Sequence, residues 1–182
     1  MQYTKLGNSD LEVSRICMGC MGFGNPNNGQ HSWTIDEEHS REIIQQGLAL
    51  GVNFFDTAIG YQSGTSEQYL GRALKDFAKR DEVIVATKFI PRTAEEIEKG
   101  ITGQQHIERL LDKSLQNLGM DYVDLYIYHM WDYQTPLYDI MEGLNRVVRQ
   151  GKARYIGISN CFAFQLAQAN ALAEREGFAK FV

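Results

Sequence analysis

The chain has 182 residues, of which 43% are hydrophobic and 11% aromatic, and its formal net charge is −5. This length and apolar content predict a single globular domain over residues 1–182. The acidic balance argues against a nucleic-acid partner. The sequence has no run of ~18 apolar residues and no apolar signal core at its start, which predicts a cytoplasmic protein without a membrane segment.

The first part of the chain is expected to be β structure. Residues 1–14 predict a hairpin, because two short β-type runs flank a cluster of turn formers at 7–10. A short apolar strand follows over 15–18 and leaves through a glycine-rich segment, where backbone can approach a ligand closely. Cys17 and Cys20 have C-x-x-C spacing, but no second pair completes a metal site, so we interpret them as small apolar residues and predict no metal.

Strand and helix patterns then alternate along the rest of the chain. Helices are expected where apolar residues recur at helical spacing: from Thr34 or Asp36 to Gly51, then over 66–79, 104–118, 137–150 and 164–176. Strands are expected at 52–55, 83–87, 123–128 and 154–159. Such an alternation predicts βαβ units and a parallel sheet.

Residues 178–182 have the pattern of the start of a further strand, and the chain stops there. Together with the strand at 15–18, the sequence therefore predicts five strand–helix units and the beginning of a sixth strand. The expected fold is an α/β (β/α)8 TIM barrel. Because such a barrel typically needs ~250 residues, we expect its last strands to be missing from this chain.

Polar residues stand where four of the predicted strands end: Asp56, Lys88, His129 and Asn160. The carboxyl ends of parallel strands open on one face of a barrel, so these side chains are expected to meet there. Tyr61 follows Asp56 by five residues and adds a phenol to the set. A carboxylate, a phenol, an ammonium and an imidazole together suit proton transfer to a carbonyl oxygen, which predicts an oxidoreductase.

Each member of this set has a possible part in carbonyl reduction. Tyr61 is the candidate general acid for the developing alkoxide, and the Lys88 ammonium would stabilise the phenolate that remains. Asp56 would pair with Lys88 and offset the cost of burying its charge. His129 could orient the carbonyl through a hydrogen bond. Taken singly, a strand-end Asp is commonly a helix cap or ion-pair partner, and a Tyr is usually core packing.

In these residues and the segments around them, the chain resembles the aldo-keto reductase family. The matching stretches are 18–24, 51–58, Tyr61, 86–88, 121–125 with His129, and 151–160. They follow the order of the family across nearly the whole chain. The aromatic-rich insert after His129 and the general sequence style are most similar to bacterial members related to the potassium-channel β-subunit branch.

The resemblance implies NADPH-dependent reduction of aldehydes and ketones, or the reverse oxidation of alcohols. It places a set of residues against the cofactor: Gly19, Cys20 and Met21 through backbone groups, Asp56 near the nicotinamide ribose, and Ser159 and Asn160 on the nicotinamide carboxamide. Cys20 stands where many relatives carry Thr or Ser, so no side-chain hydrogen bond is expected there. Ser159 and Asn160 could instead cap the helix that follows them.

Three aromatic residues are expected in loops at the barrel mouth. Trp33, Trp131 and Tyr133 could form an apolar wall for a small carbonyl substrate, although packing on the surface is nearly as good an explanation. The remaining histidines, among them His106, have no metal-ligand spacing and are predicted to be solvated or capping. A homo-oligomer is possible.

Two further interpretations stay open. A regulatory subunit that keeps the fold and the cofactor but has little turnover would not need a Lys–Tyr pair, so the intact set favours an enzyme. The other is an inactive truncated fragment, because the missing strands would carry the groups that hold the cofactor's pyrophosphate and 2′-phosphate.

Overall fold

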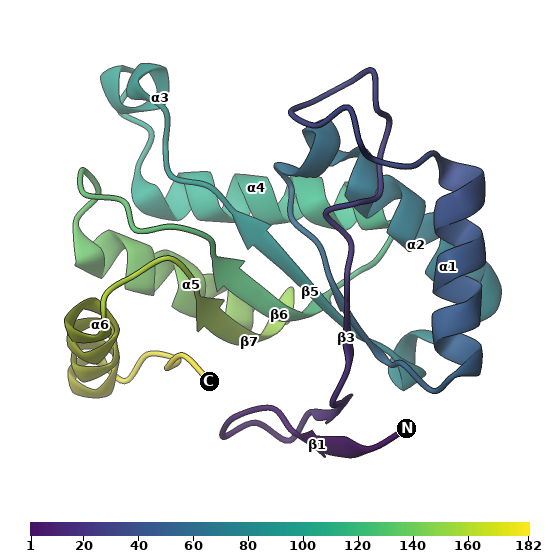
Figure 1. Ribbon diagram of the computed structural model, residues 1–182. Coiled ribbons are helices and arrows are strands. Elements are labelled where there is room, and N and C mark those ends of the chain that lie inside the picture. The colour runs from purple at the N-terminus through teal and green to yellow at the C-terminus, as the bar shows by residue number, and fades with distance from the viewer.

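A five-stranded parallel sheet forms the centre of the computed structural model, which describes residues 1–182 (Figure 1). Its strands, in spatial order, are β3 (Cys17–Gly19), β4 (Phe54–Asp56), β5 (Ile84–Phe89), β6 (Val123–Tyr128) and β7 (Ala153–Ile158). The main helices are α1 (Glu37–Ala49), α2 (Thr65–Phe77), α4 (Gly103–Leu118), α5 (Leu137–Arg149) and α6 (Ala163–Glu176). Neighbouring strands are consecutive in the chain, as expected of βα units.

The five predicted βα units are confirmed, and they form consecutive units of a (β/α)8 barrel. The predicted cap of α1 is Asp36, whose side chain accepts a hydrogen bond from the His39 backbone, and Gly51 has a φ of 87° after the helix, as a helix-ending glycine does. None of the helices combines the length and apolar character needed to cross a membrane.

Several boundaries differ from the sequence expectation by one or two residues, among them the start of β3 at Cys17 and the start of β4 at Phe54. β5 continues to Phe89, past the predicted end at residue 87, because Lys88 and Phe89 stay in register with β6 and are both buried. The expected sixth strand is present only as a parallel bridge between Phe181 and Ile156 of β7.

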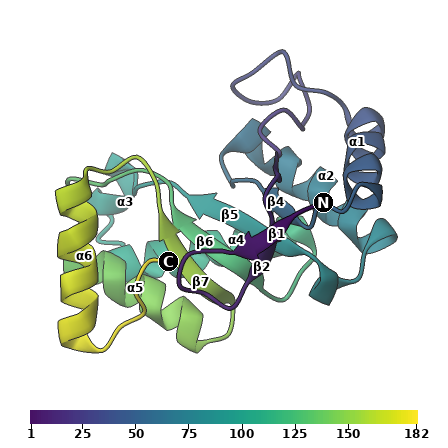
Figure 2. The same ribbon diagram turned by 60° about the horizontal axis from the view of Figure 1, so that its bottom comes forward.

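The apolar core lies in two layers, one on each face of the sheet. The larger layer fills the space between the strands and the helices and includes Phe55, Val85 and Tyr126. The smaller layer joins Leu11 and Ile84, and it lies where the N-terminal hairpin crosses the amino ends of the strands (Figure 2). Polar residues at the carboxyl ends are therefore left at the opposite end of the sheet.

The hairpin consists of β1 (Tyr3–Lys5) and β2 (Glu12–Ser14), which pair antiparallel. Its turn is tied to β7 through Asp10, which accepts hydrogen bonds from the Tyr155 hydroxyl (2.8 Å) and from Arg154 (3.3 Å). Arg154 also pairs with the buried Asp124 (3.1 Å). These polar contacts fix the hairpin across the amino ends of the strands.

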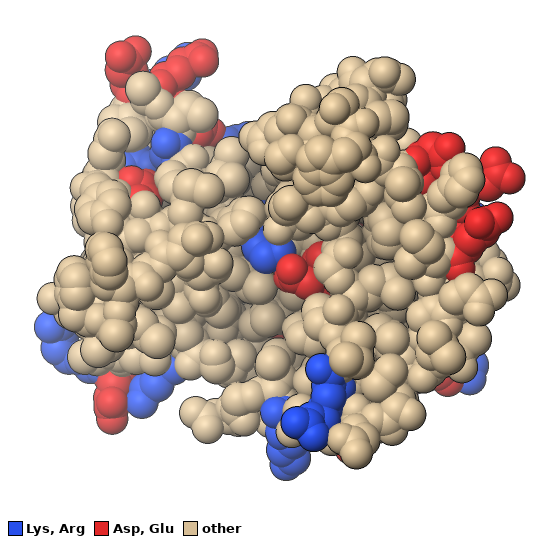
Figure 3. Space-filling view, in the orientation of Figure 1, with Lys and Arg blue, Asp and Glu red and all other residues tan.

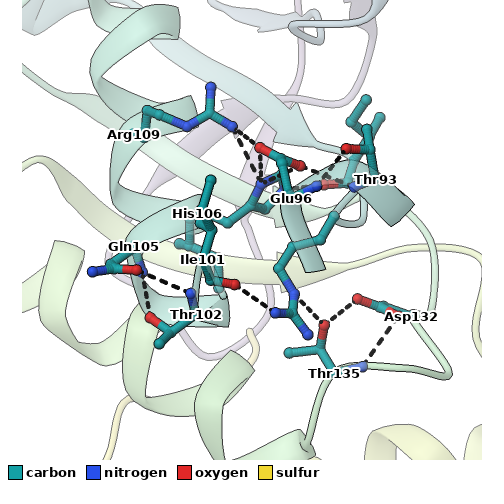
Figure 4. Close-up of polar contacts among 12 residues, drawn as sticks. Thr93, Glu96, Ile101, Thr102, Gln105, His106, Arg109, Asp132 and Thr135 are labelled. Atoms are coloured by element: carbon teal, nitrogen blue, oxygen red, sulfur yellow. Dashed lines mark hydrogen bonds and ion pairs between the residues drawn. The ribbon is translucent and has the colours of Figure 1, made fainter. Parts of the chain in front are cut away.

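A short helix, α3 (Ala94–Glu98), interrupts the long loop between β5 and α4, where the residues show no helical period. Thr93 and Glu96 form a reciprocal capping box at its start. The base of this loop is closed by Arg92, which donates to the carbonyl of Ile101 (2.6 Å) and to the hydroxyl of Thr135 (2.9 Å) (Figure 4). Side chains distant in sequence thus hold α3 above the sheet.

The prediction that His106 is solvated or capping is wrong. His106 is 3% exposed, and its ring links two segments. Nε2 lies 2.8 Å from the carbonyl oxygen of Ile90, and Nδ1 lies 3.2 Å from the carboxylate of Glu96, which also pairs with Arg109 (Figure 4). His106 therefore anchors α3 to the first turns of α4.

Glu67 of α2 is a fully buried carboxyl that forms no ion pair. It accepts hydrogen bonds from the Thr87 hydroxyl (2.6 Å) and from the Asn117 amide (2.8 Å), and it is 0% exposed. Burial raises the pKa of Glu67, and the hydrogen bonds from Thr87 and Asn117 oppose that rise.

We predict that Glu67 makes the fold less stable as the pH rises. The folded chain keeps the Glu67 proton to a higher pH than the unfolded chain, so the free energy of unfolding should decrease from pH 4.5 upward through the raised pKa. A difference of one in pKa between the folded and unfolded chains corresponds to about 1.4 kcal/mol. Urea unfolding at several pH values should show that Glu67→Gln removes this slope. Glu12→Gln, at an exposed position of β2, is the matched control and should keep it.

Candidate active site

Strand geometry brings three of the predicted site residues together. Asp56 ends β4, Lys88 is the fifth residue of β5, and His129 directly follows β6. Successive side chains on a strand point to opposite faces. Lys88 therefore shares its face with Ile84, which belongs to the smaller apolar layer, on the inner face of the sheet. The polar ends of the strands therefore meet inside the sheet's curve, at its carboxyl end.

The ammonium group of Lys88 is the centre of the site. The side chain is 8% exposed, and Nζ donates to the Asp56 carboxylate (2.8 Å), to the Thr57 carbonyl (2.7 Å) and to the phenol oxygen of Tyr61 (3.3 Å). A lysine has three N–H donors and no acceptor, so these contacts use all of them. The Tyr61 oxygen thus serves as an acceptor, and its own O–H is free to donate to another group.

His129 stands beside Tyr61 at the end of the neighbouring strand. The two rings are 5.9 Å apart between centroids and nearly perpendicular, at 80°. Burial and the nearby charge of Lys88 lower the pKa of His129, while Asp56 acts in the opposite direction. Nδ1 is buried without a hydrogen-bond partner. An unmatched lone pair costs less than an unmatched N–H, which favours the neutral tautomer with its hydrogen on Nε2.

Ser159 and Asn160 form a polar exit from β7. The Asn160 amide nitrogen donates to the His129 carbonyl (2.7 Å) and to the Ser159 hydroxyl oxygen (3.0 Å). Asn160 has a φ of 49°, a left-handed conformation that Asn tolerates better than most residues. These contacts leave the Asn160 amide oxygen and the Ser159 O–H without a protein partner in the site.

The residues at the exit of β3 differ in how accessible they are. Gly19 pairs in register with Asp56, and no atom lies within 4 Å of the position a Cβ would take there. Met21 is 40% exposed. Cys20 is fully buried, its N–H donates to the Asp56 carbonyl (2.8 Å), and its carbonyl accepts from Ser66 (2.7 Å). Gly19 and Met21 are thus open to a ligand, whereas the polar groups of Cys20 are already used by the fold.

The structure does not bring the three mouth aromatics into contact with one another. Trp33 is exposed and stacks on His31, with 4.7 Å between the ring centroids. Trp131 is partly buried against the larger apolar layer, and its ring centroid lies 6.0 Å from that of Tyr128. Tyr133 is 76% exposed. An aromatic wall built from all three therefore stays a prediction.

Sequence reasoning missed Gln62, the residue directly after Tyr61. Gln62 is 1% exposed and has a φ of 47°. No period or motif marks it. The only signals were the glycines Gly24 and Gly29, which adopt φ values of 139° and 130° in the loop that Gln62 contacts.

Most of the face in the orientation of Figure 1 is uncharged. Figure 3 shows charged side chains mainly toward its edges, with one basic and one acidic group side by side in a central hollow. Two segments rise on opposite sides above the carboxyl ends of the strands, the loop 25–34 and α3 (Figure 1). The site is thus flanked by two projecting segments.

Comparison with known proteins identifies related chains. The aldo/keto reductase family matches residues 15–182. A crystal structure of a thermostable aldo-keto reductase, solved with the inhibitor epalrestat, superposes with a TM-score of 0.80 at 30% identity and covers 94% of this chain and 58% of its own.

Curated relatives include several oxidoreductases. Versiconal hemiacetal acetate reductase of Aspergillus parasiticus is 34% identical over 100% of this chain and 57% of its own length. Aryl-alcohol dehydrogenase [NADP(+)] of Phanerodontia chrysosporium is 32% identical over 94% of this chain and 47% of its own. A probable voltage-gated potassium channel subunit beta of Oryza sativa subsp. japonica is 35% identical over 96% and 51%. The chain spans about half the length of the curated relatives it matches.

We predict that two histidines titrate on opposite sides of the ordinary value of 6.5. The pKa of His129 should lie below this value, because burial disfavours the imidazolium. The pKa of His39 should lie above it, because Asp36 hydrogen-bonds the charged ring. NMR titration of the ring resonances, assigned with His129→Asn and His39→Asn, measures both. Since unfolding would restore the ordinary pKa of His129, this residue should also lower the free energy of unfolding as the pH falls below 6.5. A reversed order of the two midpoints contradicts the proposed environment of His129.

Proposed function

The chain belongs to the aldo/keto reductase family, and from this premise we propose that it is an oxidoreductase that reduces aldehydes or ketones to alcohols. The observation that carries this proposal is the set of hydrogen bonds around Lys88. Its ammonium is buried, all three of its donors are engaged, and one of them points at the phenol oxygen of Tyr61.

In this proposal Tyr61 is the general acid. Because its oxygen accepts from Lys88, its O–H is free to donate to the oxygen of a bound carbonyl. As negative charge develops on that oxygen, the proton moves from Tyr61 to it, and the ammonium of Lys88 stabilises the phenolate that remains. Asp56 pairs with Lys88 at 2.8 Å and offsets the cost of burying its charge.

His129 has the part of a second donor to the carbonyl oxygen. Its lowered pKa keeps the ring neutral near pH 7, and the favoured tautomer carries the hydrogen on Nε2. A neutral donor can orient and polarise the carbonyl without competing with Tyr61 for delivery of the proton. The edge-on approach of the two rings, 5.9 Å apart, is consistent with both acting on one oxygen.

The proposed cofactor is NADPH, which when bound would supply a hydride to the carbonyl carbon. The free Ser159 O–H and the free amide oxygen of Asn160 are a donor and an acceptor, which is what a carboxamide needs from a protein. The open space above Gly19 leaves room for the nicotinamide end. The NADP(+) in the name of the Phanerodontia chrysosporium relative supports this choice.

The proposed substrates are aromatic carbonyl compounds. Two relatives are named aryl-alcohol dehydrogenases. In this chain Trp33 and Tyr133 are exposed and Trp131 is partly buried, so aromatic surface is present in the loops after the strands. A panel of benzaldehydes and aliphatic aldehydes of similar size, assayed by NADPH and NADH consumption, tests both cofactor and substrate. A clear preference for the aliphatic compounds contradicts the aromatic class.

A second candidate is a cofactor-binding regulatory subunit with little turnover. It is supported by the similarity to a probable voltage-gated potassium channel subunit beta. The two candidates differ in one measurement, since a regulatory subunit binds NADPH without consuming it when aldehyde is added.

Tyr61→Phe should lower kcat by at least ~100-fold, the scale of general acid catalysis, with the affinity for NADPH nearly unchanged. The variant removes the phenol O–H and little else, so binding should survive. Steady-state kinetics and a fluorescence titration with NADPH measure the two effects, on the longest polypeptide that can be expressed. Tyr138→Phe, on the exposed side of α5, is the matched control. Turnover by Tyr61→Phe at the rate of that control removes Tyr61 from the acid role.

Lys88→Met should lower kcat by at least ~100-fold as well, because the phenolate loses its neighbouring cation. The change also leaves the Asp56 carboxylate without its partner. Lys75→Met, at an exposed position of α2, removes a positive charge far from these contacts and should leave kcat unaltered. An equal kcat for Lys88→Met and Lys75→Met would contradict a role of Lys88 in the reaction.

A further inference from the structure

The side chain of Gln62 is buried and is hydrogen-bonded only to the loop 25–34. Its Nε2 donates to the carbonyls of Asn25 (2.9 Å) and His31 (2.7 Å) and lies 3.1 Å from the hydroxyl of Thr34. Its Oε1 accepts from the backbone N–H of His31 (2.9 Å). Every hydrogen-bonding group of the amide is therefore directed into one loop. We call this set of contacts the Gln62 clasp.

The loop is shaped around Gln62. A Cβ at Gly24 would lie 2.5 Å from the Gln62 Cβ, and a Cβ at Gly29 would lie 2.6 Å from the Gln62 Cα. Both glycines also have positive φ. The loop can close on the Gln62 side chain only because these two positions carry no side chain of their own.

The backbone that carries this side chain is in an uncommon conformation. Gln62 has φ 47° and ψ 48°, and Ser63 has φ 54° and ψ 35°, two consecutive left-handed residues that are not glycine. Such residues persist only where the surrounding contacts over-determine them. Thr65 adds one such contact, since its hydroxyl donates to the Gln62 carbonyl (2.7 Å) and accepts from the N–H of Asn25 (3.0 Å).

The turn and the loop connect two parts of the proposed site. Tyr61 directly precedes Gln62, so the backbone angles at Gln62 help to set where the phenol oxygen stands relative to Lys88. At the other end, the loop carries the stacked rings of His31 and Trp33. Its backbone rises above the carboxyl ends of the strands (Figure 1).

We propose that Gln62 is a positioning residue that holds Tyr61 and the His31–Trp33 pair in one fixed arrangement through the Gln62 clasp. The inference rests on the proposed reductase function for its consequence on turnover. The clasp itself is a property of the free protein. Through the clasp, the turn after Tyr61 also supports the loop 25–34, which carries the proposed substrate contact Trp33.

The chemistry of the clasp requires an amide of this length. Glutamate would bring no donors to the carbonyls of Asn25 and His31, and leucine would bring neither these donors nor an acceptor for the His31 N–H. Asparagine is shorter by one methylene and would not span the same gap. The matched control is Ser63→Gly, which relieves the neighbouring left-handed residue, while the Ser63 side chain is exposed.

The first test needs no substrate. In Gln62→Gly, amide hydrogen exchange across residues 25–34 should be at least about tenfold faster than in the unaltered chain, because a loop without its anchoring bonds opens locally. The ring-carbon NMR resonance of Tyr61, assigned with Tyr61→Phe and recorded on ¹³C-tyrosine-labelled protein, should shift or broaden. Ser63→Gly should change neither. Slow exchange in Gln62→Gly, or a Tyr61 resonance like that of Ser63→Gly, overturns the proposal.

The second test uses turnover. Gln62→Gly should lower kcat through Tyr61 and raise KM for aromatic carbonyls through the loop, whereas Ser63→Gly should do neither. A wild-type protein without turnover refutes the proposed function, while the exchange and resonance measurements still decide on the clasp. Should Gln62→Gly not fold, Gln62→Asn tolerates the same backbone conformation and carries the same expectations. If Gln62→Gly exchanges faster but has the same kcat and KM as Ser63→Gly, the clasp only stabilises the loop, and the positioning role of Gln62 is refuted.

Discussion

The arrangement of the site depends on the burial of one positive charge. A lysine ammonium taken out of water needs partners for its donors, and Lys88 finds them in a carboxylate, a backbone carbonyl and a phenol oxygen. These partners come from β4 and from the turn that follows it, so the pairing of β4 with β5 and the conformation of that turn are both tied to the same atom. The orientation of Tyr61 follows from this requirement.

Much of this was visible in the sequence, because it is encoded locally. Apolar period and turn residues predicted the βα units, and the position of Asp56 and Lys88 at strand ends predicted that they would meet. What the sequence did not show depends on partners far along the chain. His106 has no local motif, and its burial follows from the Ile90 carbonyl 16 residues away. Gln62 is likewise explained only by a loop about 30 residues before it.

The two ends of the sheet differ in chemistry: the amino ends are closed and largely apolar, and the carboxyl ends are polar. At the amino ends, the hairpin and the inner apolar layer close the curve of the strands, and Asp124 and Arg154 reinforce that closure. At the carboxyl ends, the backbone and the side chains leave free donors and acceptors, such as the Ser159 O–H and the imidazole of His129. Barrel proteins commonly separate stability from function in this way, and the proposed site of this chain follows the same division.

The hairpin's attachment to β7 sets an order of events during synthesis on the ribosome. Each strand of the sheet pairs with its neighbour in the chain, so β3 to β6 can assemble as they emerge, and the Lys88 contacts can form early. Asp10 and Tyr155, in contrast, are 145 residues apart in the sequence. The turn of the hairpin therefore gains its contact with β7 only after β3 to β6 have been made, whereas Ser14 and Glu12 of β2 can bond to Asn53 well before that.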